Sequence, residues 1–277
     1  MHTMPTTALL GKRLSTIASK IVTKLSPKLN KKRAVKSLLT PKRIQSKWPA
    51  RVKKFNTPTR YGNLKTYQYG EGKSVWLVHG WSNSAFSFWP LMQSLAERGY
   101  ACTTFDFPAH GLSKGQQTSL PQMIKAFEDV SDVLLDPSMI IAHSTGASIV
   151  ANSCFFERFN RDLLLVSPVL NSYSLMNKIA KNTGIEQQLF DEVIHDLFKK
   201  EKLFLPDLNV SQKLASFYGE LTIIHDKQDD ISPFSQSEQL SLKSEIPLIS
   251  TNNLGHHKIL KSKSIVKVIE SKNCLAT

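Results

Sequence analysis

Short apolar runs that alternate with helical patterns constrain the fold of this chain more than any other feature of its sequence. From residue 61 onward, runs typical of strands lie at residues 74–78, 100–105, 138–142, 163–167, 221–224 and 247–250. Helical patterns lie between several of these runs, at residues 89–98, 120–135 and 146–156. Alternation of this kind predicts an α/β fold, in which a mostly parallel central sheet is covered by helices on both faces. The loops at the carboxyl ends of such strands are where the chemistry is expected.

The distribution of charge divides the chain into two parts. Residues 1–60 hold 16 of the 36 Lys and Arg residues and no Asp or Glu, whereas the rest of the chain carries 20 basic and 22 acidic residues. We therefore expect a basic N-terminal arm at residues 1–60 and a nearly neutral domain at residues 61–277. The 3 cysteines are too few and too scattered for a disulfide framework or a zinc cluster, which favours reduced thiols and a cytoplasmic protein.

Within the arm, residues 8–29 predict a basic amphipathic helix. Leucine and isoleucine recur at steps of three or four positions, and lysine and arginine occupy the remaining faces. Three interpretations stay open: the apolar stripe packs on the following domain, the helix makes peripheral contact with an anionic membrane, or the segment is a mitochondrial transit peptide. Nucleic acid is not an expected partner, because the arm has little aromatic interleaving and no recognisable reading module. After about Lys31 we expect an ordered but irregular lead-in.

The loop that follows the run at residues 138–142 carries the strongest chemical signal. From Ala142 to Gly146 it reads Ala-His-Ser-Thr-Gly, between an expected strand and an expected helix. This is the pattern of a nucleophile elbow, a turn so tight that the positions two before and two after the serine must be small. Because the turn exposes the serine at a helix N-terminus, where free N–H groups favour developing negative charge, Ser144 is the predicted nucleophile.

A serine hydroxyl needs a histidine that takes its proton and a carboxylate that orients the histidine. For this elbow the expected order along the chain is serine, acid, histidine. The turn after residues 221–224 holds three candidate acids, Asp226, Asp229 and Asp230. A later loop offers His256 as the expected base, with His257 as the alternative.

On these features the chain resembles the α/β-hydrolase superfamily, in its serine esterase and lipase-like branch, over residues 74–269. Residues 79–81, His-Gly-Trp, look like the family's oxyanion loop, and residues 106–113 look like its Asp-x-x-x-x-Gly-x-Ser stretch. The resemblance implies that Asp229 is the acid and that His256, which follows a glycine, is the base. Asp226 departs from the pattern, because many members of the family have glycine there.

The resemblance also implies the rest of the site. The backbone N–H groups of Trp81 and Thr145 would form the oxyanion hole. A small helical cap at about residues 168–218 would roof a hydrophobic pocket, with Trp81 and Phe86 as substrate contacts. No cofactor is required, and the histidines and acids lack metal-ligand spacing. His79, His110 and His143 are expected to pack or to hydrogen-bond the backbone of nearby loops.

The expected function is that of a serine hydrolase, which cleaves a carboxylic ester or a related acyl bond of a small apolar substrate through Ser144, His256 and Asp229. Two alternatives stay open. One is a membrane-surface or interaction protein that uses the basic arm and has an idle hydrolase core. The other is a non-hydrolytic enzyme on the same fold, such as an acyltransferase, a lyase or a perhydrolase, because the fold alone does not choose the reaction.

Overall fold

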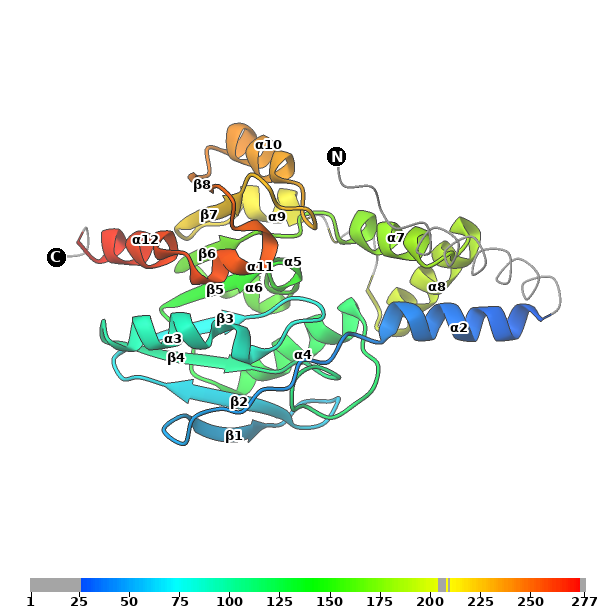
Figure 1. Cartoon of the computed structure of the whole chain (residues 1–277), viewed down its shortest axis with the longest axis horizontal. Coiled ribbons are helices and arrows are strands. Elements are labelled where there is room, and N and C mark those ends of the chain that lie inside the picture. Colours follow the sequence, from blue (N-terminus) through cyan, green and yellow to red (C-terminus); the bar gives the residue numbers. More distant parts are fainter. Residues whose placement is uncertain (1–25, 204–207, 209, 275–277) are drawn as a thin grey trace.

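An eight-stranded sheet forms the centre of the computed structural model, which describes residues 26–203, 208 and 210–274 (Figure 1). The strands are β1 (Lys53–Thr57), β2 (Leu64–Tyr69), β3 (Lys73–Val78), β4 (Tyr100–Phe105), β5 (Met139–His143), β6 (Asp162–Val166), β7 (Leu221–Asp226) and β8 (Leu248–Thr251). They follow the order β1-β2-β4-β3-β5-β6-β7-β8 across the sheet. The pairs from β4 to β8 are parallel, whereas β1 and β2 are antiparallel additions at one edge. The predicted mostly parallel α/β sheet is confirmed.

Helices lie on both faces of this sheet. They are α2 (Pro27–Leu39), η1 (Ala85–Phe88), α3 (Trp89–Ala96), α4 (Leu120–Val133), α5 (Thr145–Ala151), α6 (Cys154–Arg158), α7 (Ser172–Asn182), α8 (Gln187–Lys200), α9 (Val210–Ala215), α10 (Phe234–Ser244), α11 (Gly255–Lys258), η3 (Ile259–Lys261) and α12 (Lys263–Cys274). Among the described residues no helix is long and apolar enough to cross a membrane.

The alternation of side chains along β3 divides the interior into two cores. Trp76 and Val78 pack with residues of α4 and α5 on one face of the sheet, whereas Val75 and Leu77 pack with residues of α3 and α12 on the other. All four side chains are at most 1% exposed, so both faces of the strand are covered. Successive side chains of a strand point to opposite faces, and a run with no polar member is therefore typical of a central parallel strand.

One predicted helix is two helices in the structure. Sequence analysis expects a continuous helix over residues 146–156, but α5 ends at Ala151 and α6 begins at Cys154. The side chain of Asn152 donates a hydrogen bond to the carbonyl oxygen of Ser148, and the Ser153 hydroxyl donates one to that of Val150. Asn and Ser side chains compete in this way with the hydrogen bonds of the helix, which explains the break.

The lead-in expected after Lys31 is more regular than its sequence indicates. Pro27 opens α2 in the first turn, where its missing N–H costs nothing, and β1 follows after a non-helical segment. Strand β1 pairs with β2 across the buried hydroxyls of Thr57 and Thr66, which lie 2.7 Å apart. Four of its five residues are exposed or half-exposed, so it lacks the apolar pattern of a strand. The sheet thus begins before residue 61, the predicted start of the domain.

Helices α7, α8 and α9 occupy the segment between β6 and β7, where the cap at about residues 168–218 is expected. Helices α7 and α8, here called the cap, lie side by side with α2 (Figure 1). Helix α2 buries Ala34, Leu38 and Leu39, and the ammonium group of Lys31 lies 2.6 Å from Glu192 and 2.8 Å from Asp196 on α8. Of the amphipathic helix predicted at residues 8–29, residues 8–25 lie outside the described residues.

Candidate active site

Ser144 lies in a sharp turn between β5 and α5. Its backbone has φ 59° and ψ −127°, a strained conformation for a residue with a side chain. A Cβ atom at Gly146 would clash with the carbonyl oxygen of Val78, so glycine is required two positions after the serine. Ala142 is fully buried on the other side of the turn, where a single methyl group fits. The local sequence therefore produces the turn that places the serine at the N-cap of α5, where its hydroxyl lines the cavity.

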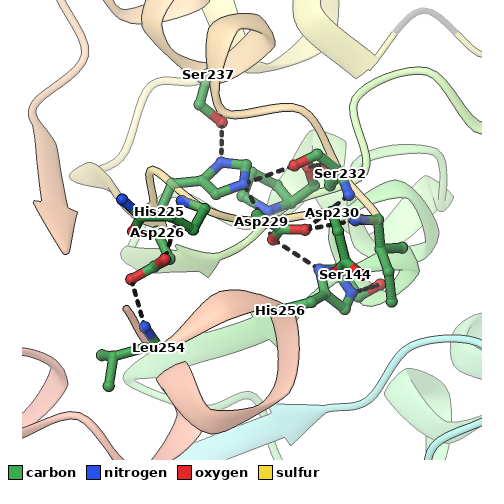
Figure 2. A network of polar contacts seen from close by, with 12 residues as sticks. Ser144, His225, Asp226, Asp229, Asp230, Ser232, Ser237, Leu254 and His256 are labelled. Atoms are coloured by element: carbon green, nitrogen blue, oxygen red, sulfur yellow. Dashed lines mark hydrogen bonds and ion pairs between the residues drawn. The ribbon is translucent and has the colours of Figure 1, made fainter. Parts of the chain in front are cut away.

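A chain of hydrogen bonds joins Ser144, His256 and Asp229 (Figure 2). The Ser144 hydroxyl lies 2.8 Å from Nε2 of His256, and Nδ1 of the same ring lies 2.7 Å from Oδ2 of Asp229. The side chains of His256 and Asp229 are 3% and 0% exposed. The three residues come from the elbow, from α11 and from the turn after β7, so the carboxyl ends of separate strands bring them together. In this arrangement Nδ1–H donates to the carboxylate and leaves Nε2 free to accept the serine proton.

Asp229 is held as an anion by several donors. Its Oδ1 accepts the backbone N–H groups of Ile231 and Ser232 at 2.9 Å and 2.8 Å, and its Oδ2 faces both His256 and His225. Burial by itself raises the pKa of the Asp229 carboxyl, but the hydrogen bonds from His225 and His256 outweigh it and bring the pKa far below its ordinary value. A carboxylate that stays charged can orient the His256 ring and stabilise its protonated form.

The sequence alone assigned no role to His225, and in the structure this residue contacts the acid. Its Nε2 lies 3.2 Å from Asp229 Oδ2 and 3.1 Å from the carbonyl oxygen of Ser232, so this nitrogen carries the proton. Its Nδ1 lies 2.7 Å from the hydroxyl of Ser237 on α10, which then donates. Figure 2 shows the resulting chain from Ser237 through His225 to Asp229. The available signal was a histidine that directly follows the mostly apolar run at residues 221–224.

Asp226 and Asp230, the other candidate acids, lie elsewhere in the turn. Asp226 accepts the Thr251 hydroxyl at 2.8 Å and the backbone N–H of Leu254 at 3.1 Å. It therefore ties the end of β7 to the loop that carries His256, a role that glycine at this position could not fill. Asp230 lines the cavity beside Ser144. Of the three, only Asp229 lies within hydrogen-bond distance of His256 in the described residues.

The remaining histidines near the site support its loops. His143 Nε2 donates to the carbonyl oxygen of His256 at 2.8 Å, and burial lowers the pKa of His143 to about 3. His79 accepts the backbone N–H of Phe107 at 3.2 Å, and His110 accepts that of Ser82 at 3.1 Å. The expectation that His79 and His110 hydrogen-bond loop backbone is confirmed. His257 lines the cavity but has no hydrogen bond to Ser144 among those described.

The two predicted oxyanion donors lie beside the serine. The backbone N–H of Trp81 faces the hydroxyl oxygen of Thr145 at 3.3 Å, and the N–H of Thr145 lies at the N-terminus of α5. A Cβ atom at Gly80 would lie 2.7 Å from Cβ of Ser144 and 2.9 Å from the nitrogen of Thr145, so only glycine permits this close approach of the loop. Both amide groups thus lie next to the Ser144 side chain.

One cavity is lined by Ser144, and a second lies beside the neighbouring Thr145. The larger has a volume of ≈ 880 Å³ and is lined by Ser144, Thr145, His256, Trp81 and Phe86, among others. The smaller, of ≈ 60 Å³, shares Trp81 and Thr145 with it and is enclosed by residues of α2 and the cap. The predicted substrate contacts therefore both line the large cavity. Within the part of the chain that the structure describes, no group of three or more His, Cys, Asp or Glu residues could hold a metal ion.

The chain was compared with protein families, with curated proteins and with solved structures. Residues 71–218 match the family described as "Serine aminopeptidase, S33", a segment that includes Ser144 but ends before Asp229 and His256. No curated protein shows a significant match to the sequence.

Several solved structures are similar to this chain. An esterase from Pyrococcus furiosus is 19% identical with a TM-score of 0.60, and the match covers 84% of this chain and 94% of that chain. A serine hydrolase from Cycloclasticus zankles is 18% identical with a TM-score of 0.56, covering 79% and 96%. A thioesterase domain from the curacin biosynthetic pathway is 12% identical with a TM-score of 0.58, covering 79% and 98%. At these identities the likeness shows a shared fold.

Proposed function

The chain belongs to the serine aminopeptidase S33 family of α/β-hydrolases, and on this premise we propose that it is a serine hydrolase that cleaves an ester or a related acyl bond. The observation that carries the proposal is the chain of hydrogen bonds from Ser144 through His256 to Asp229 at the wall of an open cavity. Each link has the distance and the donor direction that nucleophilic catalysis by serine needs.

In the proposed reaction, His256 Nε2 takes the proton of Ser144 while the serine oxygen attacks the acyl carbonyl carbon. The anionic Asp229 stabilises the protonated His256 ring, which then gives its proton to the leaving alcohol or thiol. An acyl group remains bound to Ser144. Water, activated by the same histidine, attacks that acyl group and releases a carboxylic acid.

The negative charge that develops on the carbonyl oxygen would be met by the N–H groups of Trp81 and Thr145. The contact from the Trp81 N–H to the Thr145 hydroxyl is long, at 3.3 Å, so a charged substrate oxygen would readily replace it. A single donor of this kind is worth about 3 kcal/mol of transition-state stabilisation.

The cavities favour a small apolar acyl group. The smaller one, of ≈ 60 Å³, is lined by Leu38, Leu39, Leu175, Met176 and Ile179 beside Thr145. Because this lining carries no charge and is mainly apolar, the smaller cavity suits an apolar acyl group better than a charged one.

An ester or thioester is a better candidate than the N-terminal peptide bond in the family's description. An aminopeptidase substrate carries a cationic amino group close to the scissile bond. The large cavity is lined by Lys42, Lys178 and Lys261 against one carboxylate, Asp230. Because like charges repel, this lining disfavours an ammonium group.

The basic arm and the cell compartment are part of the proposal. Residues 8–29 would bring the enzyme to an anionic membrane surface, where apolar esters partition. The unpaired thiols of Cys102 and Cys154 support a reducing, cytoplasmic compartment. Deletion of residues 1–25 should then abolish binding to anionic vesicles and leave turnover of a water-soluble ester unchanged. Unchanged vesicle binding would contradict the proposed membrane contact.

The test of the hydrolase is a time course with short-chain p-nitrophenyl esters, with the wild type beside Ser144→Ala. We expect turnover by the wild type and a loss of about 10⁴-fold or more in the variant, because the nucleophile is removed. Circular dichroism checks that the variant keeps its fold. Equal rates in the two proteins would contradict the proposal.

A further inference from the structure

We infer that the substrate has an anionic leaving group, an alcohol or thiol that carries a carboxylate or a phosphate, which Lys42, Lys178 and Lys261 hold at the mouth of the large cavity. The inference deepens the proposed function and rests on it. On one side of the scissile bond it places an apolar acyl group in the smaller cavity. On the other side it places a negatively charged leaving group at the mouth of the large cavity.

The three lysines come from separate parts of the chain. Lys42 lies in the segment between α2 and β1, Lys178 on α7 of the cap, and Lys261 at the end of η3. All three are exposed, and all line the cavity that Ser144 and His256 also line. Their convergence is therefore a product of the tertiary structure and not of a local basic stretch.

The positive charge of these lysines is not cancelled locally. Lys178 Nζ lies 3.2 Å from the backbone carbonyl oxygen of Asp230, a neutral acceptor that leaves its charge in place. Lys31, Lys125 and Lys272 each contact a carboxylate at 2.6–2.9 Å, whereas none of the three mouth lysines has such a partner among the described residues. With Asp230 as the one carboxylate of the lining, the mouth has an excess of positive charge.

Charge also decides which end of the substrate faces inward. The lining of the smaller cavity contains no charged residue, only apolar side chains and the hydroxyl-bearing residues Ser37, Ser119, Thr145 and Ser172. A carboxylate or phosphate placed there would lose its hydration without gaining a cationic partner, which is costly. At the mouth the same group keeps part of its water and gains the lysines. The anion is therefore assigned to the leaving side and the apolar group to the acyl side.

A matched pair of thioesters tests this assignment. S-acetyl-3-mercaptopropionate and its carboxamide share the acyl group and nearly the same shape, and they differ in one negative charge. The wild type should hydrolyse the carboxylate with the higher kcat/KM. An exposed ion pair contributes a factor of about two to five, so replacing all three lysines by glutamine should reduce that preference about tenfold.

Two controls are the neutral carboxamide and a lysine that lies away from the cavity. In the variant with Lys42→Gln, Lys178→Gln and Lys261→Gln, the readout is the ratio of kcat/KM for the carboxylate to that for the carboxamide, because a general effect of the substitutions on the site changes both values and cancels in the ratio. Lys53→Gln, on the edge strand β1, should leave both rates unchanged. Raising the ionic strength from about 0.02 M to about 0.5 M should weaken the preference in the wild type, since salt screens exposed charges.

The outcomes separate this inference from the proposed function. Equal kcat/KM for the two thioesters in the wild type, or an equal loss for both in the triple variant, would overturn the anionic leaving group and leave the hydrolase standing. If both thioesters resist cleavage, each is measured as an inhibitor of p-nitrophenyl acetate hydrolysis, with the same preference expected. Failure of every ester to react would instead contradict the proposed function.

Discussion

Asp106, at the end of β4, and Asp229, in the turn after β7, are both buried carboxylates at the carboxyl ends of strands. Asp106 accepts the backbone N–H groups of Ala85 and Leu112 and the hydroxyl of Tyr67, all at 2.8–2.9 Å. Asp229 likewise accepts two backbone N–H groups, but its remaining donors are the rings of His225 and His256.

The difference lies in whether a donor can change its charge. Tyr67 keeps its proton, since burial in the first place, and then the charge of Asp106, raise the pKa of its phenol well above the ordinary value. Asp106 therefore has neutral donors and joins its own loop to β2 and η1. His256 can become a cation during a reaction, so Asp229 faces a partner whose charge can vary. The same residue type at equivalent places in the sheet is thus suited to structural support in one case and to charge stabilisation in the other.

The largest expected effect comes from Asp229→Asn. An amide offers no charge and favours the wrong tautomer of His256, so kcat for a p-nitrophenyl ester should fall about 10⁴-fold. Steady-state kinetics measure the loss, and circular dichroism shows whether the fold is kept. A loss of less than about tenfold would mean that Asp229 does not have the role proposed for it.

The same substitution in the other loop, Asp106→Asn, should act on stability. The amide NH₂ of the variant would face N–H and O–H donors, and the unsatisfied groups should lower the free energy of unfolding by about 2–3 kcal/mol. Urea denaturation measures this change. The exposed Asp132, changed to Asn, is the matched control and should shift stability by less than about 0.5 kcal/mol. If the Asp106→Asn variant kept full stability and lost its activity, the structural role assigned to Asp106 would be wrong.

The next prediction concerns His143, a buried histidine that stays neutral in the folded protein. Because burial lowers its pKa to about 3, the folded state excludes a proton that the unfolded chain binds below about pH 6.5. Stability should be full above about pH 6.5 and fall as the pH drops towards 3, by up to about 1.4 kcal/mol per pH unit for each such histidine.

The variant His143→Gln tests this slope and keeps a donor for the carbonyl oxygen of His256. Unfolding measured between pH 7 and pH 4 should depend less on pH in the variant than in the wild type. His79 and His110, whose pKa values burial lowers to about 4 and about 3, should account for part of the slope that remains. An unchanged slope would show that His143 does not titrate on unfolding.

The smallest expected effect comes from Ser237, which acts on Asp229 only through His225. Ser237→Ala removes the hydroxyl that hydrogen-bonds His225, so the ring loses one of its anchors and kcat should fall about fivefold or less. Ser241→Ala on the same helix removes a hydrogen bond to the carbonyl oxygen of Ile246, away from the site, and should leave kcat unchanged. Equal kcat values in the two variants would show that Ser237 has no influence on Asp229.

Local patterns in the sequence were sufficient for the central strands and the elbow. A strand buried on both faces must be apolar throughout, and the turn at Ser144 needs small neighbours, so both leave a signature within a few residues. Strand β1 left no such signature, because an exposed edge strand needs no apolar face. The break between α5 and α6 was also missed, because it depends on side-chain hydrogen bonds from Asn152 and Ser153.

The sequence by itself determined the α/β alternation, the position of Ser144 and the order of the candidate acids and histidines along the chain. Only the tertiary structure decided that Asp229, and not Asp226, lies against His256, and that His225 lies behind it. It also decided that α2 and the cap enclose the small cavity beside Thr145. The physical reason is distance along the chain. Ser144 and His256 are separated by 112 positions, and no local preference of the backbone specifies such a contact.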